Sequence, residues 1–360
     1  MQKSINAEIF IKLIIGVLSI FLSYHIIVWE FYTSKIFGKK DGMYIGDVGR
    51  MSYQVDSLYP RKLQYTLKKR ILNHNEYKDK KIDIVTIGDS YSNGGGGGLN
   101  PYYQDFIATR YNKNILNLQR MAHGDHTPFE LVLILYNTGW LEKHKPQMVI
   151  VESSVREVYN RFAKEFDFSW TKENTDFSVG EAKTQDSHIP KLLMINTANY
   201  KFPFYSLKYK FKDRAFKTVA KATLNQKFFT TKDYESTLLF HYDDVTRIQN
   251  NQKKIKQINE NFNKLALLLK PLNIKLVFMP AVDKYDLYSE FIENNSYSKN
   301  SFFNIIEPLR KEYFFLNTKK ILLPLLHNGE KDIYYSDDTH WSYKASKEIA
   351  KNFNFEKNTL

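Results

Sequence analysis

Residues 81–92 read Lys-Ile-Asp-Ile-Val-Thr-Ile-Gly-Asp-Ser-Tyr-Ser, a β-rich run that ends at Gly88 and is followed directly by Asp89 and Ser90. The alternation and the β-branched residues predict a short strand. Gly88 allows the backbone to turn tightly, and such a turn holds the Ser90 hydroxyl out of the sheet. Because a serine hydroxyl is a poor nucleophile unless a base removes its proton as it attacks, this stretch predicts a partner base elsewhere in the chain.

The candidate base lies near the other end of the chain. Residues 334–342 read Tyr-Tyr-Ser-Asp-Asp-Thr-His-Trp-Ser and precede the last predicted helix. A catalytic histidine needs a carboxylate to fix its tautomer and to stabilise the imidazolium, and either Asp337 or Asp338 could reach His340 through a loop. In the alternative interpretation the two aspartates cap the helix and His340 is a surface histidine.

Strands and helices alternate between these two stretches. Strands are predicted at 81–87, 114–118, 147–152 and 274–279, and helices at 101–110, 128–143, 245–269, 302–313 and from 342, with a short apolar run at 321–326. This order predicts an α/β fold with a parallel sheet covered on both faces, whose site lies at the carboxyl ends of the strands. The irregular segment 160–244 is interpreted as an insertion or cap over that edge.

The N-terminus is strongly apolar. Residues 9–29 form a run that approaches the length needed to span a bilayer. We expect a tail at 1–8, an uncleaved transmembrane anchor at 9–29, a juxtamembrane segment at 30–80 and a catalytic domain at 81–354. A cleaved signal or a buried core helix is the alternative. Flanking lysines slightly favour the opposite orientation, so the expectation of a single-pass protein with its catalytic domain outside the cytoplasm comes from the chemistry.

Composition narrows the possible functions. The 360 residues carry a formal net charge of +13 and no cysteine, which excludes disulfides, thiolate catalysis and Cys-based zinc sites. The lysines are spread along the chain, and no nucleic-acid motif is present, so we expect no nucleic-acid partner. Neither a metal nor a cofactor is expected.

The two motifs together resemble the SGNH (GDSL) hydrolase superfamily. Within it, Tyr334-Tyr335 followed by Asp338-Thr339-His340-Trp341, and the segment 280–288, resemble the alginate O-acetyltransferase-like (DHHW-type) branch. The similarity covers roughly 81–156 and 245–352. It implies a flavodoxin-like three-layer sandwich and acyl transfer or ester hydrolysis on a carbohydrate. It also implies a membrane-bound O-acyltransferase as a possible partner that supplies acyl groups.

The resemblance implies further site residues. The Gly124 N–H corresponds to the second oxyanion donor, beside the N–H of Ser90, and a plain turn glycine is the alternative. The family's oxyanion asparagine is missing after the third strand, where Ser153, Ser154 or Arg156 could serve or could cap the following helix. Asp89 is a further candidate for the oxyanion and substrate-binding set. Because of their proximity to the site, His123 or His126 could contact substrate, with a metal site as the alternative.

Two departures from the branch remain open. Its Asp-x-His-Trp motif precedes the serine, whereas here it follows. The spacing in ordinary SGNH enzymes therefore indicates Asp337 as the acid, whereas the Asp-Thr-His-Trp sequence indicates Asp338. Both stay candidates, with a slight preference for Asp337. The five glycines at 94–98 lack the Lys-Ser/Thr of a phosphate-binding loop and are interpreted as a mobile loop beside the nucleophile.

The leading functional prediction is an O-acyltransferase, most simply an O-acetyltransferase, of a cell-envelope or exported polysaccharide. The alternatives are an acyl or acetyl esterase that uses water as acceptor, and a non-catalytic polysaccharide-assembly factor.

Overall fold

A computed structural model describes residues 2–40, 43–54, 65–72, 80–96, 100–118, 126–170, 192–216 and 218–354. At its centre lies a parallel five-stranded sheet, which confirms the predicted α/β class. Its strands are β3 (Ile84–Ile87), β4 (Ile115–Leu118), β5 (Met148–Ser154), β9 (Lys275–Ala281) and β10 (Phe314–Phe315). They run in the order β10-β9-β5-β3-β4, which is 2-1-3-4-5 when these strands are counted along the chain.

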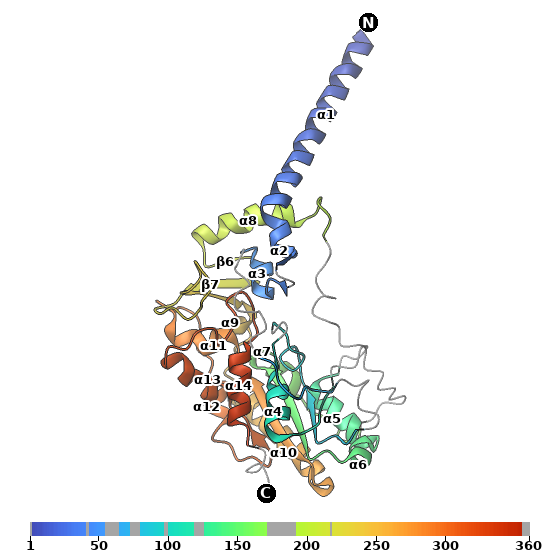
Figure 1. The fold of residues 1–360 in the computed structure, drawn as a ribbon, viewed down its shortest axis with the longest axis vertical. Helices are drawn as coiled ribbons and strands as arrows, with labels where there is room; N and C mark the ends of the chain where they lie inside the picture. Colours follow the sequence, from blue (N-terminus) through green and yellow to red (C-terminus); the bar gives the residue numbers. More distant parts are fainter. Residues whose placement is uncertain are drawn as a thin grey trace.

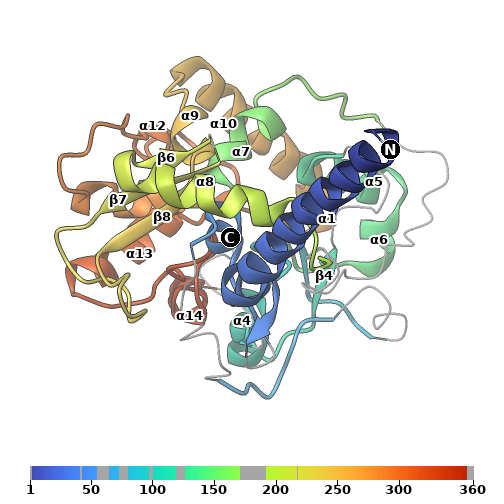
Figure 2. The same ribbon diagram turned by 90° about the horizontal axis from the view of Figure 1, so that it is seen from above.

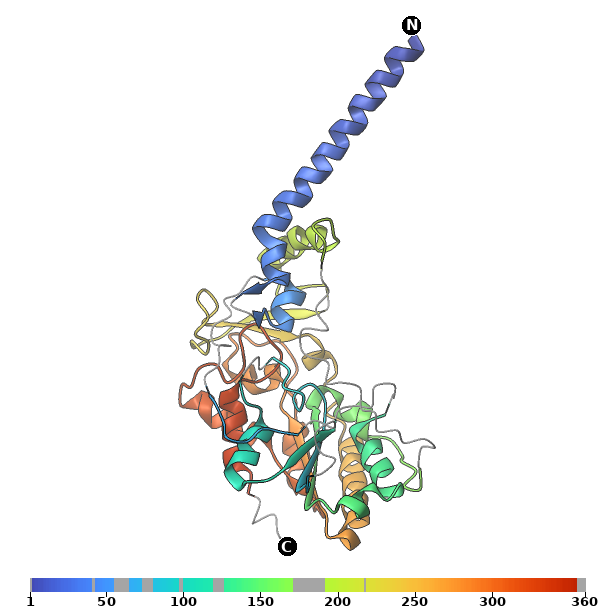
Figure 3. The same ribbon diagram turned by 45° about the vertical axis from the view of Figure 1, so that its right-hand side comes forward.

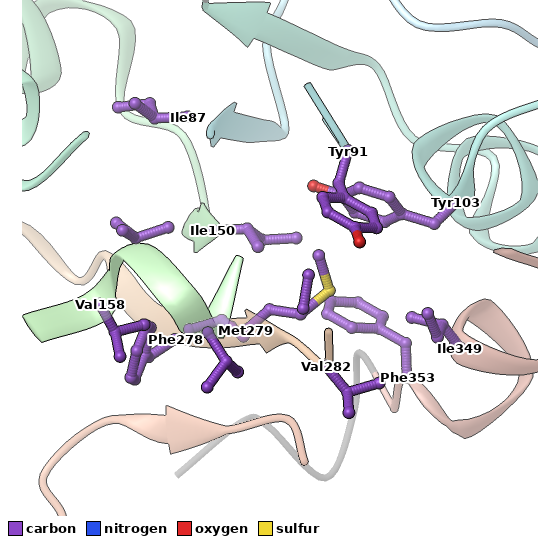
Figure 4. Close-up of a cluster of buried hydrophobic side chains, with 14 of the residues drawn as sticks. Ile87, Tyr91, Tyr103, Ile150, Val158, Phe278, Met279, Val282, Ile349 and Phe353 are labelled. Carbon is purple, nitrogen blue, oxygen red and sulfur yellow. The ribbon is translucent and has the colours of Figure 1, made fainter. Parts of the chain in front are cut away.

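Helices cover both faces of this sheet (Figure 3). One layer consists of α5 (Pro128–Asn137), α7 (Val155–Phe162) and α10 (Gln252–Leu269), and the other of α4 (Tyr103–Tyr111), α13 (Thr318–His327) and α14 (Tyr343–Asn352). The shorter helices are α6 (Trp140–His144), α9 (Asp243–Thr246), α11 (Lys284–Tyr288) and α12 (Phe302–Ile306). Apolar side chains from strands and helices form one continuous core, part of which Figure 4 shows.

Three local differences from the sequence prediction have physical causes. The helix expected at 128–143 breaks at Gly139, whose φ of +73° ends α5 and starts α6. The helix expected at 245–269 is interrupted before Asn251, whose side chain caps α10 by accepting from the N–H of Lys254. The apolar run 321–326 belongs to helix α13, while the fifth strand is only two residues long and too short to leave a sequence pattern.

The segment expected to be irregular contains a small antiparallel sheet. The strands of this sheet are β6 (Arg214–Ala215), β7 (Val219–Thr223) and β8 (Thr237–His241), in the order β6-β7-β8. Helix α8 (Ala198–Phe211) precedes them in the chain. Strand β8 packs against α11, which follows the carboxyl end of β9. The insert therefore lies at the carboxyl edge of the main sheet, between that edge and the N-terminal helix (Figure 1).

The N-terminal helix projects away from the body of the protein (Figures 1 and 3). Helix α1 (Gln2–Val28) continues through the π-helical turn η1 (Trp29–Thr33) into α2 (Ser34–Phe37). Within the described chain this is the one helix long and apolar enough to cross a membrane, and most of its apolar window is exposed. Two short antiparallel strands, β1 (Lys39–Lys40) and β2 (Met43–Tyr44), then lead into helix α3 (Asp47–Ser52).

Candidate active site

Ser90, His340 and Asp338 form a continuous hydrogen-bonded chain. Ser90 is exposed in the turn after β3, and its Oγ lies 2.7 Å from Nε2 of His340. On the other side of the ring, Nδ1 of His340 lies 2.5 Å from Oδ1 of Asp338. His340 and Asp338 are 8% and 1% exposed, so a buried base and acid support an accessible hydroxyl. This is the arrangement that activates a serine for attack.

The preference for Asp337 was wrong as to which carboxylate contacts His340. Oδ2 of Asp337 instead accepts the backbone N–H of Gly46 at 2.8 Å, and the Asp337 carbonyl accepts the N–H of Gly49. Asp338 curls back toward the histidine, since its Oδ1 also accepts the backbone N–H of His340 at 3.0 Å. The tight turn at 335–340 thus points the two adjacent carboxylates to different partners.

Buried groups hold the loop that carries His340. The ammonium of Lys284, from α11, donates to the backbone carbonyls of Tyr335, Ser336 and Asp338 at 2.7–3.0 Å. The hydroxyl of Tyr91 donates to the carbonyl of Thr339 at 2.8 Å. Because the resemblance singled out 280–288 without giving Lys284 a role, this anchoring lysine was missed.

Tyr91 links the nucleophile turn to the core as well as to the histidine loop. Its ring lies in the buried cluster near Tyr103 (Figure 4) and 4.9 Å from the ring of His340. The residue after Ser90 therefore supports the histidine that Ser90 contacts.

A second carboxylate reaches the same histidine from the segment that follows the N-terminal helix. The carboxylate of Asp47, at the start of α3, accepts the N–H and the hydroxyl of Thr339 at 2.7 and 2.5 Å. Its Oδ2 lies 4.0 Å from Nδ1 of His340, and its own N–H donates to Asp338 Oδ2 at 3.3 Å. The segment between the N-terminal helix and the sheet is therefore part of the site and more than the expected connection into the fold.

These carboxylates favour the protonated form of the histidine. Burial alone would lower the pKa of His340, but the charge and hydrogen bond of Asp338, together with the charge of Asp47, raise it above its usual value. Ligand atoms of Asp47, Asp338 and His340 all lie within 4.8 Å of one another, as in some metal sites. Each of these side chains has protein hydrogen bonds, so we interpret the cluster as a hydrogen-bonded relay.

Asp89 supports the nucleophile turn from below. One carboxylate oxygen accepts from the guanidinium of Arg161 at 2.6 Å and from the N–H of Ser154 at 3.0 Å, and the other accepts from the N–H of Tyr91. Burial would raise the pKa of Asp89, but Arg161 and the Ser154 N–H hold it well below its usual range. The interactions of Asp89 are those of a charged positioning residue.

Glu152, from β5, lies beneath the same turn. Its Oε2 accepts from the backbone N–H of Asp89 and Ser92 and from the Ser92 hydroxyl, at 2.8–3.2 Å. Burial and the neighbouring charge of Asp89 raise the pKa of Glu152 well above its usual value. A Cβ at Gly88 would lie 2.3 Å from this carboxyl, which explains why the strand ends in glycine.

The described part of the glycine run packs against the Ser–His–Asp chain. A Cβ at Gly95 would lie 2.6 Å from Nε2 of His340, and one at Gly96 would lie 2.8 Å from Oδ1 of Asp338. The N–H of Gly95 also donates to the Ser90 carbonyl at 2.7 Å. Close approach to the histidine, which sequence analysis did not foresee, is thus the physical reason for these glycines.

The other predicted site residues differ in outcome. Ser154 lies at the end of β5 and uses its N–H to hold Asp89. Arg156 is partly buried and binds Asp244 at 2.9 Å, with Asp283 3.6 Å away, while Ser153 accepts from Arg161. These interactions position the site and leave the third oxyanion donor unassigned. Gly124 and His123 lie outside the described residues.

Comparison of the chain with protein-family models gave no matching family, and comparison with curated proteins gave no match. The described residues establish an α/β fold with a parallel five-stranded sheet, in which Ser90, His340 and Asp338 meet at the carboxyl edge.

Proposed function

We propose that this chain is a membrane-anchored serine O-acyltransferase, most simply an O-acetyltransferase, that modifies a cell-envelope or exported polysaccharide outside the cytoplasm. The observation that carries the proposal is the 2.7 Å contact between Ser90 Oγ and His340 Nε2, backed by the 2.5 Å contact of His340 Nδ1 with Asp338. Such a chain suits acyl transfer through a covalent serine ester.

Two further features support this assignment. The strand order 2-1-3-4-5 is that of flavodoxin-like sheets, as the resemblance to SGNH hydrolases implies. In such sheets ligands bind at the carboxyl ends where the strand order reverses, here beside β3, the strand that Ser90 follows. The apolar helix α1 suits a single-pass anchor.

The proposed reaction has two balanced halves. Ser90 Oγ attacks the acyl carbonyl while its proton passes to His340 Nε2. The donor's leaving group then departs with that proton, which leaves an acyl ester on Ser90. A sugar hydroxyl next attacks this ester and gives its proton to His340. When the C–O bond to Ser90 breaks, His340 returns the proton to Ser90 and the acylated sugar is released. A membrane-bound O-acyltransferase is the proposed source of acyl groups.

The acceptor distinguishes this proposal from an esterase. Full-length protein in vesicles should transfer acetyl from an activated acetyl ester to glycan oligomers, and Ser90→Ala should lose the transfer by orders of magnitude. Ser169→Ala, at an exposed serine whose hydroxyl donates to Asp167, is the matched control. Acetate release without glycan acetylation would identify an esterase, whereas full polymer acetylation in cells carrying Ser90→Ala would identify a non-catalytic assembly factor.

A further inference from the structure

Helix α8 begins at the base of the N-terminal helix (Figures 1 and 2). The hydroxyl of Tyr24 donates to the carbonyl of Asn199 at 2.7 Å, and the amide of Asn199 contacts Nδ1 of His25 at 2.8 Å. Thr33 donates to the same amide at 2.5 Å. Three residues of the α1–η1 helix thus converge on Asn199, so the start of α8 is fixed to the end of the apolar helix.

One face of α8 is apolar and exposed beyond its first turn, where Tyr200 packs on Tyr24 and His25 of α1. Tyr200, Phe204, Leu207 and Phe211 follow one another at steps of four, three and four residues, which places them in a single row. They are 43%, 64%, 56% and 79% exposed in the structure. Large apolar side chains gathered in such a row mark an interaction surface.

The exposed row is not the face by which α8 packs on the protein, because a different face of the helix makes those contacts. The ring of Phe202 stacks on that of Tyr32, and the ring centroids of Tyr205 and Tyr53 lie 4.8 Å apart. The hydroxyl of Tyr209 donates to the carbonyl of Val219. The helix is therefore apolar on two sides, of which the protein core uses one.

Lysines border the exposed row. On a helical wheel Lys201 and Lys208 lie along one side of the row and Lys210 along the other, and all three are exposed. Just before α8, Leu193, Met194 and Ile195 extend the apolar surface and are 80%, 38% and 45% exposed. Aromatic and aliphatic side chains flanked by lysines are typical of a helix that lies at the boundary between lipid head groups and acyl chains.

We propose that α8 is embedded in the head-group layer of the membrane that α1 crosses, with Phe204, Leu207 and Phe211 inserted among the lipids. The proposal rests on the membrane anchoring in the proposed function, but not on the chemistry at Ser90. A bilayer is the occupant that the structure favours, because the row starts beside the apolar helix and its lysines match anionic head groups. The anchor and α8 would then hold the domain at two points and fix its tilt.

The lack of cysteine in the chain allows a direct test. Single variants Leu18→Cys, Leu207→Cys and Leu267→Cys place one label on α1, α8 and α10, at positions 53%, 56% and 51% exposed. Each full-length protein is labelled with an environment-sensitive fluorophore and reconstituted in vesicles of phosphatidylcholine and phosphatidylglycerol. Lipids brominated on their acyl chains then report contact with the bilayer.

The labels at positions 18 and 207 should be quenched several-fold more than the label at position 267, and their emission should be blue-shifted. A label at 207 that behaves like the one at 267, while 18 is quenched, would overturn the proposal and leave the anchor in place. Loss of quenching at 18 as well would remove the anchoring on which it rests. A label at 207 shielded from aqueous iodide but not quenched by brominated lipid would show a protein cover and also overturn it. Because none of these readouts requires turnover, they are independent of the acyl-transfer test.

Discussion

Oδ2 of Asp47 lies 4.0 Å from Nδ1 of His340, and this is the ring nitrogen that Oδ1 of Asp338 contacts at 2.5 Å. One carboxylate comes from the histidine loop and the other from the segment that follows the N-terminal helix. The surroundings of the candidate catalytic histidine thus come from both ends of the chain. Replacing each of the two carboxylates is expected to have a different effect.

Substitution of the two adjacent aspartates should have different effects, on activity for Asp338 and on stability for Asp337. Asp338→Asn removes the carboxylate on Nδ1 of His340 and should lower kcat/KM by about 10⁴-fold, as expected when the acid of a Ser–His–Asp chain becomes an amide. Asp337→Asn leaves that contact intact and should cost stability through the Gly46 N–H. Hydrolysis of an activated acetyl ester measures the first effect and thermal unfolding the second. Equal activity losses in both variants would contradict the assignment of Asp338.

Asp47→Asn should move the pH profile. His340 accepts a proton only when it is neutral, so activity rises as the pH passes its pKa, which Asp47 helps to raise. Without this charge the acid limb of kcat/KM should shift to lower pH. The asparagine still accepts the Thr339 N–H, which limits structural damage.

The control for Asp47 is Glu260→Gln, which removes one negative charge from the exposed face of α10. Its pH profile should match that of the parent protein. An unshifted acid limb in Asp47→Asn would show that this carboxylate acts only by holding the loop.

Gly95→Ala should impair activity more than stability. The added Cβ would meet His340 Nε2 at 2.6 Å and displace the ring from Ser90, although Gly95 does not have a positive φ. Gly329→Ala is the reverse control, because its site is open but its φ is +76°. It should cost about 1 kcal/mol of folding free energy and leave kcat unchanged. A fully active Gly95→Ala protein would refute the close packing of this loop on the histidine.

Glu152→Gln should stabilise the protein increasingly as the pH rises. The folded-state pKa of Glu152 is raised, so above the ordinary value of 4.5 the unfolded chain releases a proton that the folded protein keeps. Folding of the parent therefore loses on the order of 1 kcal/mol of stability per pH unit in that window. The neutral glutamine lacks this penalty. Urea unfolding between pH 5 and pH 8 gives the difference, and a constant difference across the range would mean that Glu152 is ionised in the folded protein.

The main features of the fold could be predicted because the strands leave local signals. β3, β4, β5 and β9 are apolar runs bounded by Gly, Pro or Asn, and each formed within a few residues of its expected place. The two-residue strand β10 has no such signal, and helix breaks at Gly139 and Asn251 depend on backbone conformations that apolar spacing does not encode.

The candidate site was only partly predictable. Ser90 and His340 carry local motifs, but the choice between Asp337 and Asp338 depends on which way a turn points two adjacent side chains. Asp47 lies in a stretch with no motif at all, and its contact with Thr339 is visible only after folding. Arg156 has the right chemistry for an oxyanion donor, yet its buried partner Asp244 is distant in sequence.

The docking of α3 on the histidine loop sets the reach of the proposed enzyme. Few residues separate the end of α2 from Asp47. If α1 spans a membrane as proposed, Ser90 therefore stays close to the lipid surface, whereas a long tether would let it move away. In the proposed function, the protein acts within a thin layer next to the bilayer. Polymer strands would then be modified as they pass through that layer during export, and material already assembled farther out would go untouched.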